Sequence, residues 1–160
     1  SVCDALAPVV DVEPRIKWPN DVWLETKKVA GILVEASIVG AKVDSLVVGV
    51  GINVHTRAFP AEIEAIATSV ALHSSMQPDR ASIVARLVQA LDRDVAPVAR
   101  HGLGLVHARI QERDALRGSR VRGETGEGTA EGIDVEGRLC VRVVDGTLQR
   151  WVAGEVNLLK

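Results

Sequence analysis

The stretch Lys17-Trp18-Pro19-Asn20-Asp21-Val22, followed after a short gap by Lys27-Lys28-Val29-Ala30-Gly31-Ile32-Leu33-Val34-Glu35, decides the fold of this chain. Two apolar segments flank a polar, lysine-bearing turn, which is the pattern of antiparallel strands joined by a hairpin. Pro19 lacks an amide N–H and therefore ends a strand or lies at a sheet edge. Asn20 and Asp21 favour a turn because short polar side chains bond to their own backbone.

Further apolar runs extend this unit into a sheet. Strands are predicted at residues 15–18, 22–25, 28–39 and 45–54, with turns at residues 26–27 and 40–42. Because the connections are short, we expect mainly antiparallel pairing. The nearly continuous apolar character indicates that both faces of the sheet are at least partly covered.

Helical patterns lie on both sides of these strands. Apolar residues recur at helical spacing in residues 1–10, as at the end of a helix, so we expect the chain to be one piece of a larger protein. A proline suited to a first helical turn, with apolar residues behind it, predicts a helix over residues 60–70. Asp79 is a good N-cap for a helix whose apolar stripe covers residues 83–95. A shorter helix is expected over residues 103–112.

After residue 113 the composition shifts to Gly, Arg and short β patterns. Strands are predicted at residues 119–122, 129–135, 139–144 and 148–152. Asp145-Gly146 is a strong hairpin signal, and residues 151–156 are expected to close a small barrel. So few residues with this pattern predict a small, partly open barrel. We therefore expect two domains, residues 1–113 and residues 114–160.

Composition narrows the class of protein. A hydrophobic share of 47% with 25% charged residues is typical of a globular chain. A net charge of -2 gives no electrostatic case for a nucleic-acid partner. No apolar run approaches the roughly 18 residues of a membrane helix, and the first residues do not resemble a signal peptide. Cys3 and Cys140 are far apart in apolar surroundings, which favours free thiols over a disulfide and predicts a cytoplasmic protein.

Lys28 has two possible roles on the sequence alone. One is a solvated turn lysine paired with Glu25. The other is a fixed cation at the mouth of a cleft, able to neutralise carboxylate and phosphate oxygens. Gly31, Gly49 and Gly51 lie inside strands, where glycine weakens packing unless a ligand or another backbone approaches closely. Together these glycines favour a ligand floor.

Other polar and aromatic residues leave alternatives open. Asn20 and Asp21 make a good turn without any further role, and Asp21 could also act as a base or an orienting group. Asn53 ends its strand, where it could cap the strand or bind the polar edge of a ligand ring. Trp18 and Trp23 are interpreted as packing anchors rather than stacking platforms. The four histidines have no ligand spacing, so no metal site is predicted from them.

These motifs resemble the biotin protein ligase family. The segments that carry the resemblance are Lys17–Asp21 with Lys28–Glu35, then residues 49–54, 67–70, the helix after Asp79, and Trp151-Val152-Ala153-Gly154-Glu155-Val156. The resemblance covers essentially the whole chain. It implies an α+β fold in which a mixed, largely antiparallel sheet with packing helices, of the class II synthetase and biotin–lipoate ligase type, precedes a small SH3-like β-barrel.

The resemblance also implies a two-step, ATP-dependent reaction. Biotin and ATP form biotinoyl-5′-adenylate, and the acyl group passes to a lysine of a biotin carboxyl carrier protein domain, with Mg²⁺ arriving on the nucleotide. The implied residues are Lys28 and Asp21 in catalysis, Lys28, Gly31, Ile32 and Gly49 in biotin binding, and Lys17, Asn20 and Asn53 in nucleotide binding.

One part of the family pattern is not found in this sequence. The Ser-Thr-Asn stretch and the Gly-Arg-Gly-Arg phosphate loop of the family's N-terminal half do not occur in the 160 residues. We therefore expect the isolated chain to have little or no ligase activity. The alternatives are a non-catalytic biotin-binding fragment or homologue, or an oligomerisation module, and a homodimer is compatible with each.

Overall fold

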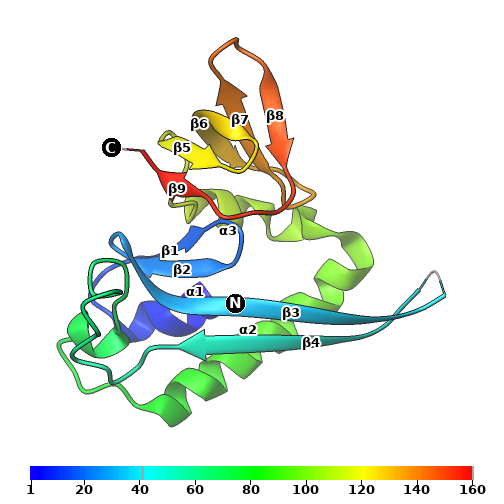
Figure 1. The fold of residues 1–160 in the computed structure, drawn as a ribbon. Helices are drawn as coiled ribbons and strands as arrows, with labels where there is room; N and C mark the ends of the chain where they lie inside the picture. Colours follow the sequence, from blue (N-terminus) through cyan, green and yellow to red (C-terminus); the bar gives the residue numbers. More distant parts are fainter. Residues whose placement is uncertain (41, 160) are drawn as a thin grey trace.

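The computed structural model describes residues 1–40 and 42–159 (Figure 1). Within them the chain forms two antiparallel sheets and a few helices, which confirms the predicted α+β class. The helices are α1 (Val2–Leu6), α2 (Arg80–His101) and α3 (His107–Glu112), with 3-10 turns η1 (Ala7–Val9), η2 (Val70–Leu72) and η3 (Leu103–Leu105). The strands are β1 (Pro14–Lys17), β2 (Asp21–Leu24), β3 (Lys27–Val39), β4 (Lys42–Ile52), β5 (Arg120–Gly123), β6 (Gly126–Ile133), β7 (Leu139–Val143), β8 (Leu148–Trp151) and β9 (Asn157–Leu158). No helix of the described residues is long and apolar enough to cross a membrane.

The first sheet has the order β1-β2-β3-β4, and each neighbouring pair is antiparallel. The four strands predicted for this sheet are confirmed, with small shifts at their ends. The first turn lies at Glu25-Thr26, one residue earlier than predicted, because Glu25 takes a φ of 56° and Lys27 already pairs with Leu24. The predicted turn at residues 40–42 includes residue 41, which lies outside the described residues.

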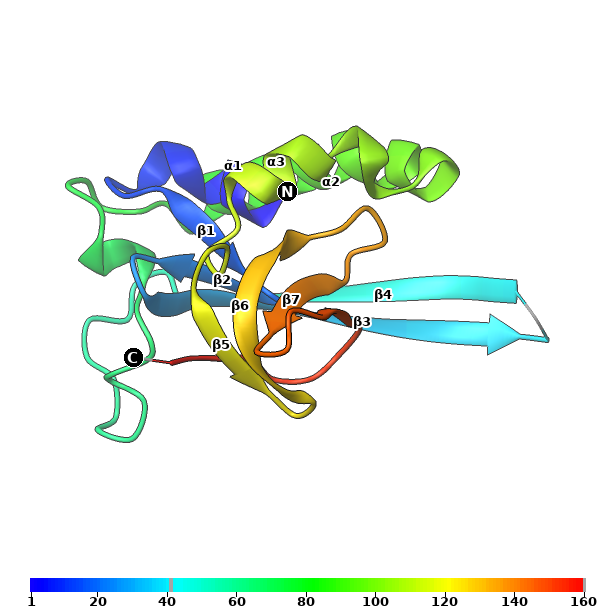
Figure 2. The ribbon, with the colours of Figure 1, turned by 90° about the horizontal axis from the view of Figure 1, so that it is seen from above.

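The outer half of the β3–β4 hairpin is uncovered, so the prediction that both faces are at least partly covered is wrong there. Large apolar side chains from Leu33 to Val48 are between 45% and 67% exposed. Figures 1 and 2 show the hairpin projecting past the rest of the molecule. The inner half is different, because Val29 and Ala30 pack with α1 and Ile83 of α2 in one core. An apolar run reports hydrophobicity but does not say which element covers it.

The helix predicted at residues 60–70 is not formed. Residues 61–66 make successive turns, in which Pro60 O accepts from Glu64 N and Ile63 O accepts from Ala67 N. The chain then pairs with the edge of the first sheet, where Lys28 N donates to Ile66 O. This edge pairing takes the backbone groups that a helix would have used.

The helix after Asp79 is confirmed as α2, and the predicted segment at 103–112 divides into η3 and α3. The Asp79 carboxylate caps α2 by accepting from Ala81 N and Ser82 N. Along the predicted apolar stripe Ile83 is buried and Leu87 and Leu91 are half-buried, whereas Val84 and Val95 are more than half exposed. The stripe therefore packs on the sheet at its start and is largely free farther along.

The second sheet follows α3 and has the order β8-β7-β6-β5-β9. The four strands predicted for it are confirmed, and β9, which pairs with β5, was not predicted. At the predicted Asp145-Gly146 hairpin, Asp145 Oδ1 accepts from Thr147 N and Gly146 has a φ of 86°. Among the described residues no pairing closes β8 onto β9, so the barrel stays a prediction.

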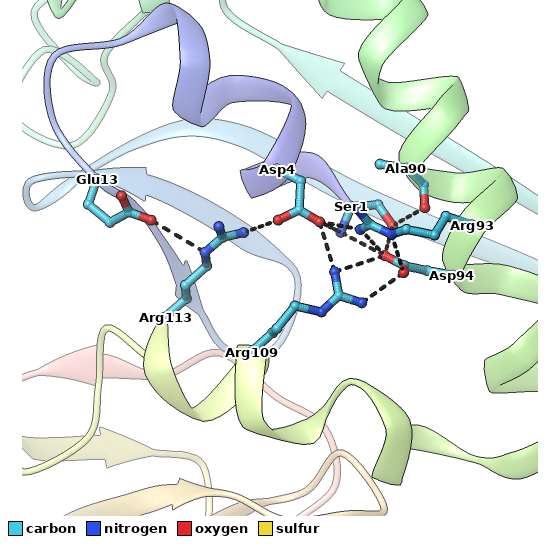
Figure 3. A network of polar contacts seen from close by, with 8 residues as sticks. All are labelled: Ser1, Asp4, Glu13, Ala90, Arg93, Asp94, Arg109 and Arg113. Carbon is cyan, nitrogen blue, oxygen red and sulfur yellow. Dashed lines mark hydrogen bonds and ion pairs between the residues drawn. The ribbon is translucent and has the colours of Figure 1, made fainter.

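A network of charges ties the three helices together (Figure 3). Asp94 on α2 accepts from Arg93 and from Arg109 of α3, and Asp4 on α1 accepts from Arg93, Arg109 and Arg113. Hydrogen bonds from Arg93, and then Arg109, hold the pKa of Asp94 well below its usual range. Burial raises the pKa of Asp4, but hydrogen bonds from Arg93 and Arg113 outweigh burial and lower it. The network fixes α3, and with it the start of the second sheet.

Candidate active site

Asp21 lies between two lysines at the start of β2. Lys28 Nζ is 2.6 Å from Asp21 Oδ1, and Lys17 Nζ is 3.9 Å from Asp21 Oδ2. The Asp21 and Lys17 side chains are 14% and 10% exposed, whereas that of Lys28 is 48% exposed. Asp21 Oδ1 is buried and has no aligned hydrogen-bond donor among the described residues, so its contact with Lys28 is an ion pair. Two cations around one carboxylate leave this cluster with a net positive charge.

Of the two possible roles of Lys28, the arrangement favours the ordered cation. Its partner is Asp21 rather than Glu25, across strands whose register is interrupted between Val22 and Trp23. The backbone of Lys28 is held on both sides, because its N–H donates to Ile66 O and its carbonyl accepts from Thr68 N. The half-exposed ammonium can contact a ligand while the backbone of Lys28 keeps both of these hydrogen bonds.

Gly31 lies directly under the Lys28 side chain. A Cβ at Gly31 would come within 3.0 Å of both Lys28 Cε and Lys28 Nζ, and within 3.6 Å of Asp21 Oδ1. Gly49 is different, since a Cβ there would meet the Leu33 backbone at 3.7 Å, which is an ordinary contact. Packing within the protein therefore explains why residue 31 is a glycine, because a larger residue would displace Lys28. It does not explain why residue 49 is a glycine.

Two adjoining cavities share Asn20 and Lys28. One, of about 470 Å³, is lined by Asn20, Lys28, Gly31, Ile32, Leu33, Gly49, Val50 and Gly51. The other, of about 300 Å³, is lined by Lys17, Pro19, Asn20, Asp21, Lys28, Gly154 and Glu155. Lys28 therefore lies where the cavity lined by glycines meets the cavity lined by charged residues. This arrangement suits a ligand with an apolar part, an anionic centre and a polar part.

A further cavity of about 360 Å³ lies between β4 and α2. Its walls are mainly apolar, including Val48, Leu91 and Val95, and it shares Asn20, Asp21 and Ile32 with the site. The charge network of Figure 3 also lines it, but the arginines of that network are paired with its aspartates, and neither Lys17 nor Lys28 lines this cavity. We place the candidate site at Lys28 because its half-exposed ammonium stands where the other two cavities meet.

Asn20 and Asn53, both predicted to bind nucleotide, are engaged in backbone contacts. Asn20 Nδ2 donates to Ile32 O at 2.9 Å and Ile32 N donates to Asn20 O, which clamps the turn onto β3. Asn53 Nδ2 donates to Thr68 O at 3.0 Å and holds the loop at the sheet edge. Asn20 lines both site cavities, whereas Asn53 lines neither of them.

The structure brings together all but one of the predicted site residues. Lys17, Asn20, Asp21, Lys28, Gly31, Ile32 and Gly49 lie around the two cavities, and Asn53 stands apart. Gly154 and Glu155, which line the charged cavity, were expected only to close the barrel. The sequence offered one signal for them, an acidic residue directly after a glycine, and in the structure that glycine has a φ of 106°.

Comparisons with known proteins agree with this geometry. Residues 6–53 match the model of the "Biotin/lipoate A/B protein ligase family", and residues 118–159 match that of the "Biotin protein ligase C terminal domain". The "Biotin--[acetyl-CoA-carboxylase] ligase" of Mycobacterium tuberculosis is 37% identical over 151 residues, covering 89% of this chain and 54% of that protein. The "Bifunctional ligase/repressor BirA" of Bacillus subtilis is 30% identical over 152 residues, covering 91% of this chain and 47% of that protein. The chain spans about half the length of these curated relatives.

Solved structures show the same relationship. The apo biotin protein ligase of Aquifex aeolicus has a TM-score of 0.87 at 26% identity, over 99% of this chain and 71% of that one. The same enzyme in complex with biotin and ATP has a TM-score of 0.85 at 26% identity, over 99% and 67%. The arrangement of both sheets, the two family matches and these relatives together show that the chain belongs to the biotin protein ligase family.

Proposed function

We propose that this chain is the part of a biotin protein ligase that holds biotin and the adenylate while biotin is activated by ATP and passed to a lysine of a biotin carboxyl carrier domain. The observation that carries the proposal is the Lys28–Asp21 ion pair, seated on Gly31 at the junction of two cavities. It is supported by the relatives' names and by the neighbouring structure solved with biotin and ATP.

In the first step a biotin carboxylate oxygen bonds to the α-phosphorus of ATP, the bond from that phosphorus to the bridging oxygen breaks, and pyrophosphate leaves. Negative charge builds on the oxygens around the α-phosphorus, including the bridging oxygen that leaves with pyrophosphate. Lys28 stabilises this charge, because a cation fixed before the reaction needs no reorganisation. Gly31, Ile32 and Gly49 form the floor under biotin, and Gly49 leaves space that the protein itself does not need.

In the second step the amine of the carrier lysine attacks the acyl carbon, AMP leaves and the amine loses a proton. Asp21 is suited to orient that amine, because its carboxylate lines the charged cavity beside Lys28. Lys17 and Asn20 line the charged cavity and would face the nucleotide. Asn53 would act on that side only through the loop it tethers.

The described residues also bear on Mg²⁺. They contain no group of three or more His, Cys, Asp or Glu side chains that could hold a metal ion. The residues of the site therefore fit a Mg²⁺ that enters on the phosphates of ATP rather than one held in a protein cage.

Four finer statements belong to the same proposal. The second sheet is an SH3-like barrel, the domain boundary falls at residues 113–114, the protein works in the cytoplasm, and a homodimer is compatible with its function. The two cores, one for each sheet, support the boundary, with Trp18 the buried residue of the first domain that packs in the core of the second sheet.

The test is biotin-dependent exchange of labelled pyrophosphate into ATP. It compares the 160-residue chain with a fusion that places the preceding part of the Aquifex aeolicus enzyme before Ser1. We expect little exchange from the chain alone and clear exchange from the fusion. In the fusion, Lys28→Ala should lower exchange about 100-fold or more, whereas the neighbouring Lys27→Ala should keep it. Appreciable synthesis by the chain alone would overturn the expected inactivity, and full exchange by Lys28→Ala would overturn the role of Lys28.

A further inference from the structure

Trp18 belongs to the first sheet by its place in the chain and to the second sheet by its packing. It directly follows β1, in the turn that leads to Asp21. Its side chain is 3% exposed and packs in the core of the second sheet, together with Leu116 and Trp151. Val22, only four residues later, packs in the other core. The turn that carries the site is therefore anchored in the second sheet.

A hydrogen bond fixes this anchor. Trp18 Nε1 donates to Gly137 O at 2.9 Å, in the turn between β6 and β7. Asp134 holds that turn, because its Oδ1 accepts from Glu136 N and Arg138 N and its Oδ2 accepts from Arg138 Nε at 2.8 Å. The acceptor of the Trp18 bond is thus itself held in place.

The second sheet also forms a wall of the site. In the cavity of about 300 Å³, Lys17 and Asp21 lie on one side and Gly154 and Glu155 on the other. The width of this cavity depends on how the site turn is held against the second sheet. Trp18 is next to Lys17 in the chain, so its contact acts close to the charges that it would control.

We propose that Trp18 is a positioning residue, which fixes Lys17 and Asp21 against the second sheet and so sets the width of the nucleotide side of the site. The reference to nucleotide rests on the function proposed above. Trp18 does not line either site cavity and acts through the turn that it anchors.

The test uses Trp18→Phe, which keeps an aromatic ring in the core and removes the N–H donor. Trp23→Phe is the matched control, since Trp23 lies in β2 and its indole makes no hydrogen bond among the described residues. The measurement is the acetylation rate of Lys17 by a water-soluble N-hydroxysuccinimide ester, followed by mass spectrometry. Lys27 is the internal reference, since its Nζ donates to Glu64 O and not to Asp21.

We expect Lys17 to react about fivefold faster in Trp18→Phe, because the loss of one neutral hydrogen bond should make local opening more frequent by about that factor. Lys17 should react no faster in Trp23→Phe than in the wild-type chain. Asp134→Ala, which loosens the acceptor turn, should act in the same direction and decides the case if Trp18→Phe fails to fold. An unchanged Lys17 rate in both folded variants would overturn the proposal, as would an equal rise in Trp23→Phe.

ATP binding to the fusion described above, measured by calorimetry, separates the two proposals. If Lys17 responds but no nucleotide binds, the positioning role stands and the proposed function fails. If nucleotide binds and Lys17 does not respond, the positioning role fails and the proposed function stands.

Discussion

Replacing Gly31 by alanine tests how Lys28 is held at the site. The new Cβ would lie 3.0 Å from Lys28 Cε and Nζ, whereas carbon contacts are most favourable at about 3.5–4.0 Å. The lysine end is flexible, so it should move by roughly 0.5–1 Å while the backbone stays in place. Its 2.6 Å contact with Asp21 would then lengthen.

The expected effect is large on chemistry and small on stability. The Lys28 side chain is about half exposed, so weakening its ion pair should cost less than about 1 kcal/mol. A Gly→Ala change stabilises by about 0.4–1 kcal/mol where the backbone permits it, which offsets this loss. Misplacing a charge by about 1 Å at a reacting centre costs up to about 100-fold in rate. We therefore expect the midpoint of urea unfolding to stay nearly constant while pyrophosphate exchange falls about 10- to 100-fold.

The assay is pyrophosphate exchange in the fusion described above, combined with NMR of the Lys28 side-chain ammonium in the 160-residue chain. Gly51→Ala is the control for the ammonium signal, because a Cβ there meets its nearest atom, Gly31 O, at 4.0 Å. The Lys28 signal should shift in Gly31→Ala and not in Gly51→Ala. Wild-type exchange in Gly31→Ala, with a shifted Lys28 signal, would refute the reasoning that the seat of Lys28 sets the rate.

Three further predictions concern the ligand and pH. Lys28→Ala should weaken binding of a non-hydrolysable biotinoyl-adenylate analogue about tenfold or more in calorimetry, and an equal loss in Lys27→Ala would contradict this. Burial raises the pKa of Asp114, so the folded protein keeps a proton that the unfolded chain releases, and stability falls as pH rises from the unfolded to the folded pKa. Asp114→Asn should remove this decline from urea unfolding curves, and an unchanged pH profile would count against it. The pKa of Asp94 is lowered in the folded protein, so its carboxylate stabilises the fold at neutral pH and less at acid pH. Asp94→Asn should therefore lower the free energy of unfolding by about 1–2 kcal/mol at neutral pH, and by progressively less as pH falls through the acid range. A loss of stability that does not depend on pH would exclude the ion-pair explanation.

The strands of both sheets, except β9, were predictable because their signals are local. Runs of Val, Ile and Leu between turn residues located β1 to β4, and Asp145-Gly146 located the β7–β8 hairpin. The Asp79 cap located the start of α2 for the same reason. The helix expected at residues 60–70 failed because its backbone pairs with the edge of β3, a competition that periodicity cannot reveal.

The site was predictable in part. The residues predicted around Lys28 lie together in the structure, apart from Asn53. The sequence assigned Gly31 to a ligand, whereas the structure shows that Gly31 first makes room for Lys28. Trp18 was interpreted as a packing anchor, and its partner core lies about a hundred residues farther along the chain. Glu155 reaches the site only through the docking of the second sheet. Contacts of this kind depend on tertiary packing and leave no local pattern.

The most direct test of the central claim is amide chemical-shift mapping of the 160-residue chain with the biotinoyl-adenylate analogue. The account predicts that the largest shifts fall at Lys28, Gly31 and Gly49, which line the site cavities and not the cavity between β4 and α2. Shifts concentrated instead between β4 and α2, around Val48 and Leu91, would place the ligand in the other cavity and contradict it.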